Sequence, residues 1–352
     1  MKKILTSCGI LVAAVLFSGC SLVPGTTTTP GTSTANFLKS SDGGVTWTPK
    51  VKIDDKKTIA AANVLSVAVH PTDPKIVYIG TEKNGLFITK DGADTWQSMA
   101  FAQKVYGLVF DKTNPLVIYA SGVYNGRGKI FKRDGEQAEW KEIYTEPSDG
   151  TYITALGVNP SNGSVIYAGT SDGVIIKSID GGVSWRNVKK AEGPVTSISF
   201  DCTNREHIYF GIFQRGILET MDGGMNLADI TNKFSSLTSG TSNNVYSVVA
   251  DPSVSGVVYI GTDQGITRGA QTGGKWDSLN IIASSTNYPI RALAINPANS
   301  KEIMYAGAGV IYRTIDGGTQ WSTFQLDTKK SAGVIQYNPS NPRDIFVGLR
   351  SL

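Results

Sequence analysis

The chain has 352 residues, of which 40% are hydrophobic and 18% are charged, so it can bury a large core and lacks the composition of a disordered protein. Its formal net charge is +4, and without the first two lysines it has 31 basic against 29 acidic side chains, a balance that argues against nucleic-acid binding. The 39 glycines, the 14 prolines and many short apolar runs ending in Gly, Asn or Asp favour an all-β chain with frequent turns.

The first predicted element is a targeting segment. Lys2 and Lys3 precede an apolar stretch, Ile10 to Phe17, that is too short to span a bilayer. The stretch runs into the letters LFSGC, which resemble the lipobox of bacterial lipoproteins, although Phe17 stands where that family usually has Leu. The resemblance implies cleavage before Cys20 and lipidation of this cysteine. The alternative is an ordinary secretory signal followed by a chance cysteine.

The domain organisation follows from this segment. Residues 1–19 are the expected signal peptide, and residues 20–35 are the lipidated cysteine with a Thr/Pro/Gly-rich tether that has no apolar periodicity. Residues 36–352 are the expected folded domain. We therefore expect an exported protein, lipid-anchored on the extracytoplasmic side of a bacterial membrane.

Cysteine and histidine usage restricts the chemistry. Cys8 lies in the expected signal peptide and Cys20 is the expected anchor, so Cys202 is left alone and the mature domain can form no intrachain disulfide. His70 and His207 have no second His or Cys at ligand spacing, so no zinc site is predicted. We expect no metal and no cofactor.

Internal repeats predict the fold. The segments VLSVAVHPTDPKIVYIGTEKNGLFITKDGADTW from Val64, ITALGVNPSNGSVIYAGTSDGVIIKSIDGGVSW from Ile153 and IRALAINPANSKEIMYAGAGVIYRTIDGGTQW from Ile290 share one order of parts. An alternating apolar run precedes an Asn-Pro-like turn, a run ending in Tyr-x-Gly, a Gly-containing loop, a third run, an Asp-Gly-Gly turn and Trp. Three weaker copies keep this order, and all six tryptophans of the chain fall at the same repeat position.

The ends of the domain supply the count of repeats. Six complete repeats lie between Val64 and Leu326, and each has three apolar runs before the Asp-Gly turn and one after it. The segment from Asn36 has only the third and fourth runs, and the segment from Gly333 has only the first and second. Together they make one more four-stranded unit. The sequence therefore predicts a seven-bladed β-propeller, with its last blade closed by N- and C-terminal strands.

The recurring turn resembles the Asp-box of sialidases, sortilin-type receptors, xyloglucanases and photosystem II assembly factors. An Asp in such a turn can accept backbone N–H groups, Gly supplies positive φ, and Trp can cover the hairpin and lock it against the next one. We interpret these positions as structural because one active site does not need several copies of its acid. The predicted box residues are Asp42, Trp47, Asp91, Trp96, Asp134, Trp140, Asp180, Trp185, Asp222, Asp316 and Trp321.

The candidate binding residues lie elsewhere in each repeat. Boxes join the third and fourth strands of a blade, whereas the functional face of a propeller is usually built by the loops between second and third strands and between blades. We expect the residues of these loops to act collectively around the mouth of one central channel. They are Glu82, Tyr124, Arg127, Asp172, Phe213, Arg215 and Asp263, with the neighbouring Lys83, Gln214 and Gln264.

Three families resemble the chain and imply different functions. Sialidases need an arginine cluster and a Tyr/Glu pair, but the sequence has no RIP-like segment near the start of the domain. Xyloglucanases place paired acids between two propellers, whereas this sequence predicts one propeller. Asp172 and Asp263 are the candidate carboxylates if the protein hydrolyses a glycan. Photosystem II stability/assembly factors are single, exported, often lipid-anchored propellers that bind a membrane-protein partner without catalysis. This third resemblance fits best and predicts a non-catalytic protein-binding or assembly module; a glycoside hydrolase or a glycan-binding propeller is the alternative.

Overall fold

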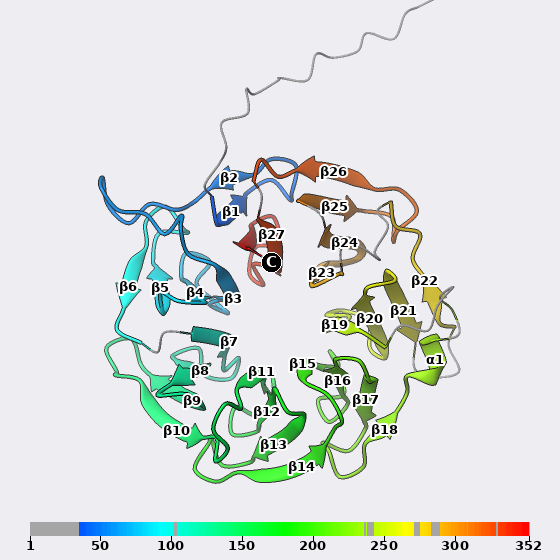
Figure 1. The fold of residues 1–352 in the computed structure, drawn as a ribbon. Helices are drawn as coiled ribbons and strands as arrows, with labels where there is room; N and C mark the ends of the chain where they lie inside the picture. Colours follow the sequence, from blue (N-terminus) through cyan, green and yellow to red (C-terminus); the bar gives the residue numbers. More distant parts are fainter. Residues whose placement is uncertain are drawn as a thin grey trace, which may run out of the picture. The chain divides into compact units, whose positions relative to one another are not determined.

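The computed structural model describes residues 35–101, 104–235, 237, 243–270, 275–282, 289–307, 309–328 and 330–351. The expected signal peptide, Cys20 and most of the tether lie outside the described residues. In the described part of the chain, strands form seven four-stranded antiparallel sheets that follow one another around a ring (Figure 1). The predicted all-β, seven-bladed propeller is confirmed.

The first three blades are built from consecutive strands, from the inner to the outer strand. Blade 1 contains β3 (Val64–Val69), β4 (Val77–Thr81), β5 (Leu86–Thr89) and β6 (Gln97–Met99). Blade 2 contains β7 (Lys104–Phe110), β8 (Val117–Tyr124), β9 (Arg127–Asp134) and β10 (Lys141–Thr145). Blade 3 contains β11 (Ile153–Val158), β12 (Ile166–Thr170), β13 (Val174–Ser178) and β14 (Arg186–Lys190).

The next three blades repeat this order. Blade 4 contains β15 (Val195–Phe200), β16 (Ile208–Ile212), β17 (Gly216–Thr220) and β18 (Ala228–Asp229), and the short helix α1 (Asn232–Ser235) follows it. Blade 5 contains β19 (Val245–Ala250), β20 (Val257–Thr262), β21 (Ile266–Ala270) and β22 (Asp277–Ser278). Blade 6 contains β23 (Ala292–Asn296), β24 (Asn299–Gly307), β25 (Val310–Thr314) and β26 (Ser322–Gln325).

Blade 7 joins the two ends of the folded domain, as predicted. Its inner strands are β27 (Ser331–Tyr337) and β28 (Ile345–Arg350), and its outer strands are β1 (Phe37–Ser40) and β2 (Thr48–Pro49). β1 pairs with β28 in a register that sets Phe37 opposite Gly348. The third strand of this blade therefore comes from one end of the domain and its second strand from the other.

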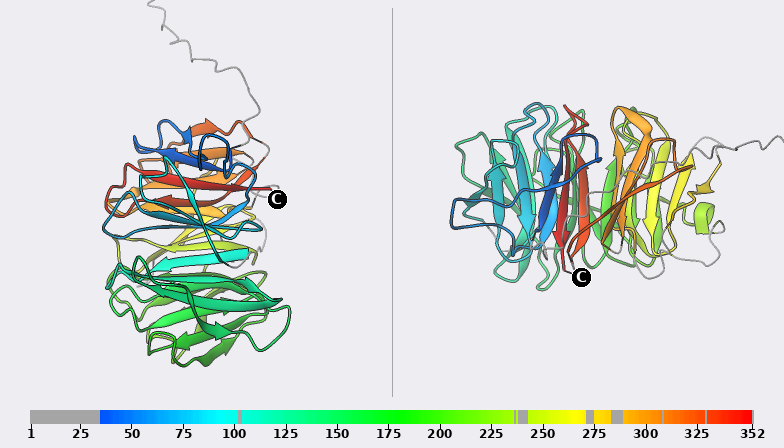
Figure 2. Two further views of the ribbon diagram at one scale, coloured as in Figure 1. Left: turned by 90° about the vertical axis from the view of Figure 1, so that its left-hand side faces the viewer. Right: turned by 90° about the horizontal axis from the view of Figure 1, so that it is seen from above.

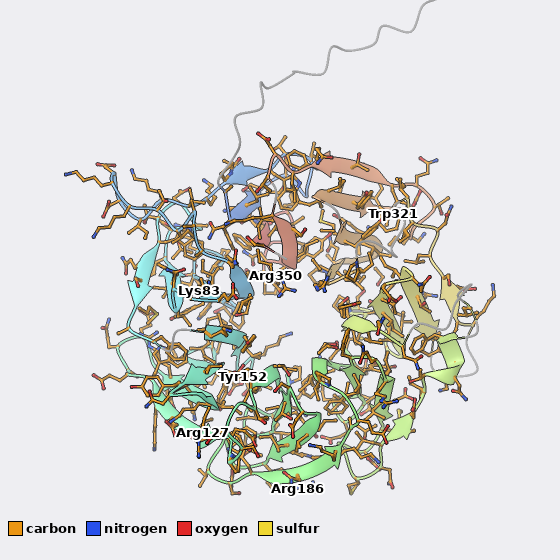
Figure 3. All side chains as sticks on the ribbon, in the orientation of Figure 1. Lys83, Arg127, Tyr152, Arg186, Trp321 and Arg350 are labelled. Atoms are coloured by element: carbon orange, nitrogen blue, oxygen red, sulfur yellow. The ribbon has the colours of Figure 1, made fainter. Side chains whose placement is uncertain are left out.

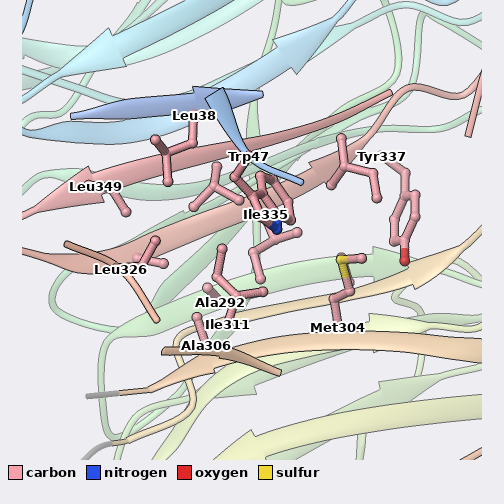
Figure 4. Close-up of a cluster of buried hydrophobic side chains, with 14 of the residues drawn as sticks. Leu38, Trp47, Ala292, Met304, Ala306, Ile311, Leu326, Ile335, Tyr337 and Leu349 are labelled. Atoms are coloured by element: carbon pink, nitrogen blue, oxygen red, sulfur yellow. The ribbon is translucent and has the colours of Figure 1, made fainter. Parts of the chain in front are cut away.

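The core lies between blades. Seven clusters of buried apolar side chains occur among the described residues, and each lies between two neighbouring blades. Figure 4 shows the cluster between blades 6 and 7, where Leu38 and Trp47 from one end of the domain meet Ile335 and Leu349 from the other. The side views in Figure 2 show the strands of neighbouring blades running alongside one another.

The Tyr-x-Gly motif reflects this close packing. Gly80 of β4 and Gly169 of β12 face the inner strand of the next blade, and a Cβ on either glycine would lie within 2.6 Å of Val105 or 2.4 Å of Val195. Such distances are well below van der Waals contact, so no larger residue fits without moving a neighbouring blade. The repeated glycine thus sets how closely successive blades approach.

The Asp-Gly hairpins join the third and fourth strands on one face, which we call the box face. Ser40 Oγ donates to Asp42 and accepts from Gly44 N, and Asp42 accepts from the backbone N–H groups of Val45 and Thr46 at 3.0 Å. Comparable bonds surround Asp91, Asp180, Asp222 and Asp316.

Asp134 departs from this pattern. Its hairpin is held instead by Arg133, which donates to Ala138 O at 2.8 Å and to the hydroxyl of Tyr78 on blade 1 at 2.7 Å. Lys132 has no hydroxyl with which to orient the Asp134 carboxylate, and its ammonium lies 3.7 Å from that group. In blade 2, Arg133 therefore stabilises the hairpin that a Ser/Thr–Asp pair stabilises in the other boxes described above.

The tryptophans link blades. The indole N–H groups of Trp96, Trp185 and Trp321 donate to Lys50 O, Ile143 O and Asn280 O, which belong to the outer strand of the preceding blade or the residues after it. Trp47 and Trp140 also contact buried clusters, but their buried indole nitrogens have no hydrogen-bond partner within the described chain.

Candidate binding face

The opposite face, which we call the loop face, carries the loops between second and third strands and the connections between blades. These two kinds of loop are bonded to each other: Glu82 N donates to Asn63 O at 2.9 Å, Ser171 N to Tyr152 O at 2.8 Å, and Phe213 N to Pro194 O at 2.8 Å. The sequence-predicted binding residues all lie in or beside these loops. The backbone bonds hold them on a rigid support, which suits a binding surface.

The two predicted arginines are engaged with acids of neighbouring loops. Arg127 Nε donates to Asp149 at 2.6 Å, and Arg215 lies 3.4 Å from the carboxylate of Glu192. Figure 3 shows Arg127 farther from the centre of the ring than Tyr152 and Arg350. Tyr124, at the end of β8, is 50% exposed. The structure thus does not bring Arg127 to the centre of the face, where the sequence analysis expected it.

The predicted carboxylates lie on different blades, and each is hydrogen-bonded to a neighbouring side chain. Asp172 of blade 3 accepts from Thr170 Oγ and from Lys190 Nζ, both at 2.5 Å, whereas Asp263 of blade 5 accepts from Asn244 at 2.6 Å. Burial acts to raise the pKa of Asp172, but the hydrogen bonds from Lys190 and Thr170 lower it below its usual value. Blade 4 lies between the two acids. Glu82 is similarly anchored by Asn63 at 2.8 Å, and this bond lowers its pKa.

Sequence reasoning missed a set of residues at the inner edge of the face. The first strand of most blades contains a β-bulge just after its first buried residue, and the bulged residue has no partner on the next strand. A bulge re-aims the side chain that it carries. The bulged residues, in blade order, are Leu65, Tyr106, Thr154, Thr196, Tyr246 and Gly333, and Arg291 holds the equivalent position before β23.

Aromatic side chains gather at these positions. Tyr106 stacks on Tyr152, with ring centroids 6.2 Å apart and planes at 27°. On the other side of the ring, Phe213 from a predicted loop lies 5.3 Å from Tyr246, and the guanidinium of Arg291 lies 4.5 Å above the Tyr246 ring. Phe213, from the predicted set, thus contacts this inner group through the Tyr246 ring.

Arg350 completes the group from the end of β28. Its stem lies across Gly333, since a Cβ on that glycine would be 3.1 Å from both Cδ and Nε of Arg350. Figure 3 shows Arg350 beside the centre of the ring, whereas Arg186 lies at the periphery. We call the residues Tyr106, Tyr152, Phe213, Tyr246, Arg291 and Arg350 the axial cluster.

One signal in the sequence could have found half of the cluster, namely Tyr106, Tyr246 and Arg291. When the repeats are aligned on the buried residue that starts each first run, the next column reads Leu, Tyr, Thr, Thr, Tyr, Arg and Gly. Positions that vary inside an otherwise regular repeat are not required for the fold, so they can carry binding residues. Arg350 cannot be found in this way because it lies on a second strand.

Two further observations bear on chemistry. No three His, Cys, Asp or Glu side chains of the described residues converge as a metal-ligand set, and His207 is buried against Glu219 at 2.8 Å. Over the same ranges of sequence, no helix has the length and apolar character needed to cross a membrane.

Comparison with known proteins identifies two kinds of relative. Residues 35–133 match the family model described as Sortilin, neurotensin receptor 3 (Sortilin-Vps10). Xyloglucanase Xgh74A of Acetivibrio thermocellus is 28% identical over 194 residues, which cover 45% of this chain and 23% of the enzyme. Photosystem II assembly lipoprotein Ycf48 of Prochlorococcus marinus is 25% identical over 163 residues, which cover 44% of this chain and 43% of that protein. The matches thus span less than half the length of these curated relatives.

Solved structures share the fold at low identity. A GH74 xyloglucanase from Xanthomonas campestris has a TM-score of 0.69 at 16% identity and is covered over 51% of its length. YCF48 from Cyanidioschyzon merolae has a TM-score of 0.60 at 15% identity and is covered over 95%. A structure described as YCF48 bound to D1 peptide has a TM-score of 0.58 at 16% identity and is covered over 93%. The expected resemblance to assembly-factor and xyloglucanase propellers is confirmed.

Proposed function

We propose that this protein is a non-catalytic binding or assembly module that recognises a protein partner through its loop face, and that a lipid on Cys20 holds it at the extracytoplasmic side of a bacterial membrane. The axial cluster is the observation that carries the proposal. Tyr and Arg side chains dominate many protein interfaces because they combine a large contact area with directed hydrogen bonds. Here Tyr106 stacks on Tyr152, Arg291 lies over Tyr246, and both Tyr106 and Tyr246 are carried by bulged strands, so binding orders few further side chains.

The relatives support a single-propeller binding role. The chain covers 95% and 93% of the two YCF48 structures but about half of the GH74 enzyme. One of the YCF48 structures is described as bound to D1 peptide, so a propeller of this fold has been seen with a peptide. The proposal takes only the binding role from this likeness, because proteins with the same fold bind different ligands.

The entry point of the chain supports the proposed anchoring geometry. Asn36 lies on the loop face, where its carbonyl accepts from Leu349 N at 2.8 Å and its amide donates to Ile59 O and Ala62 O. About 15 residues separate Cys20 from this point, a reach of at most about 50 Å. A lipid on Cys20 would therefore hold Asn36, at the loop face, within that distance of the membrane surface.

A glycoside hydrolase is the second candidate because the xyloglucanases are among the relatives. This function needs two carboxylates beside one glycosidic bond, one of them with a raised pKa as general acid. Asp172 has a lowered pKa and an ammonium partner, which suits neither role as it stands. Screening the purified domain against sialosides and β-glucans tests the alternative, and turnover that disappears on replacement of Asp172 and Asp263 by Ala would establish it.

The test of the main proposal is capture of the partner from the native host. The anchored wild-type protein is compared with a variant carrying Tyr152→Ala and Phe213→Ala, and co-purifying proteins are identified by mass spectrometry. Arg186→Ala, at the exposed rim, is the control. We expect a defined membrane protein with the wild type and the control, and its loss from the double variant at unchanged melting temperature. Equal capture by the double variant would place the partner elsewhere and contradict the proposal.

A further inference from the structure

Two arginines of the axial cluster, Arg291 and Arg350, come from adjacent blades. Neither Arg291 nor Arg350 forms an ion pair with an acid of the described residues. The Nε of Arg350 is shielded from solvent and has no hydrogen-bond partner within the same residues. A buried guanidinium N–H without an acceptor is costly, so this donor is an unusual feature for the structure to keep.

The two cations also act on each other. Burial, followed by the nearby charge of Arg291, lowers the pKa of Arg350. Burial also lowers the pKa of Arg291. Repulsion between like charges on neighbouring blades destabilises the unliganded fold, and a bound anion would reduce that cost. Glu82 is the acid that acts on Arg350, but its carboxylate is already bonded to Asn63 and is also near Lys83 and Lys104.

The scaffold fixes both guanidinium groups. Gly333 leaves open the space that a side chain fills at the equivalent position of other blades, and the stem of Arg350 occupies it. Arg291 is held over the Tyr246 ring, whose other neighbour is Phe213. Pre-organised arginines lose little entropy when they bind, and their planar forks match the geometry of a carboxylate.

We propose that Arg291 and Arg350 together form a binding site for a carboxylate of an acidic peptide, with Phe213, Tyr246 and Tyr106 contacting the apolar side chains beside that carboxylate. The proposal rests on the proposed function and adds the chemistry of the partner to it. The aromatic rings on both sides favour a peptide over a free inorganic anion, because an isolated ion would leave these apolar surfaces exposed.

The test is fluorescence anisotropy on the folded domain with a short labelled peptide in which glutamates alternate with aromatic residues, and with the same peptide carrying glutamines. We expect the glutamate peptide to bind at least about tenfold more tightly, and Arg291→Ala and Arg350→Ala each to weaken it about tenfold to a hundredfold. Arg186→Ala, which removes an exposed rim arginine, should leave affinity unchanged. Arg350→Lys keeps the positive charge but loses the planar guanidinium with its paired N–H donors, so it should also weaken binding.

Gly333→Ala is the sharpest variant because it changes no charge. Its Cβ would meet the Arg350 stem at 3.1 Å, so Cδ and Nε must shift by a few tenths of an ångström, and binding should weaken although both arginines remain. Acetate and inorganic phosphate are added as competitors, and sialyllactose is tested as an acidic glycan. Stronger displacement by phosphate than by acetate, binding of the glycan but not the peptide, or equal binding of the two peptides would each overturn the assignment.

The same variants separate this inference from the proposed function. If the native partner is still captured by the Arg291→Ala and Arg350→Ala proteins, the carboxylate site is not part of partner recognition and the inference fails while the function stands. If no partner is captured although the glutamate peptide binds in an arginine-dependent way, the proposed function fails and the site stands.

Discussion

Replacement of Trp96 by Phe tests how the blades are joined. The Trp96 indole is 1% exposed, donates to Lys50 O at 2.9 Å across the boundary between blades 7 and 1, and meets the Phe37 ring edge-on at 5.0 Å. Phe retains most of the apolar contact but removes the donor and leaves a small void. Loss of the hydrogen bond with its acceptor left unpaired costs about 1–3 kcal/mol, and the missing ring atoms add to this.

The matched control is the same change at Trp47. This tryptophan is also buried, but its indole nitrogen has no hydrogen-bond partner in the described structure. Trp47→Phe therefore removes a donor that is already unsatisfied, which offsets part of the lost packing. We expect a net change within about 1 kcal/mol, against about 2–3 kcal/mol for Trp96→Phe.

Differential scanning calorimetry and urea unfolding measure both variants. At the usual unfolding entropy per residue, a domain of this size loses roughly 1.5 °C of melting temperature per kcal/mol, so Trp96→Phe should melt about 3–5 °C lower than the parent. Equal losses for the two variants would refute the reasoning, because packing alone would then account for both and the hydrogen bond between blades would contribute nothing measurable.

Three further predictions concern the box and the closure. Asp180→Ala removes the acceptor of Ser184 N and Ser178 Oγ, so the melting temperature should fall while peptide binding persists; loss of binding at unchanged stability would show that the box is functional. Hydrogen bonds, chiefly from Ser184, lower the pKa of Asp180 from 3.8 to about 2, so its contribution to stability is complete above about pH 4 and is lost as the pH falls through 2. Urea unfolding between these pH values should therefore show a smaller acid loss in Asp180→Ala, and parallel pH curves would contradict this. Deletion of residues 333–352 removes most of β27 and all of β28, so calorimetry should show loss of cooperative unfolding, whereas a parent-like melting curve would argue against closure by these strands.

The architecture was predictable because each repeat encodes its own turns. The Asp-Gly turn, the Tyr-x-Gly run and the tryptophan recur at fixed spacing, and the two half-repeats have complementary strands, so blade number and closure follow by counting. The glycine of the second run was visible as a pattern, but its reason was not. Only the structure shows that Gly80 faces Val105 of the next blade.

The binding residues were predicted less well, for physical reasons. Arg127 and Arg215 looked like free interface arginines, but they meet Asp149 and Glu192 in connections more than twenty residues away, and no local pattern reveals such a pair. The bulges have no sequence motif of their own, and only alignment of the repeats marks the column in which they fall. The position of Arg350 depends on Gly333, and the two lie side by side only through the pairing of β27 with β28.

The pairing of β1 with β28 also delays the completion of blade 7 during synthesis. β1 emerges early, but Phe37 waits for Gly348, roughly 300 residues later, before it has its neighbour on that side. At ordinary translation rates of about 5–20 residues per second, this interval lasts roughly 15–60 seconds. Throughout it, the outer hairpin of blade 7 presents an open edge to any other nascent strand, and the first blade lacks its contacts with β27 and β28. A chaperone that covers this edge would therefore matter most before the last strand emerges.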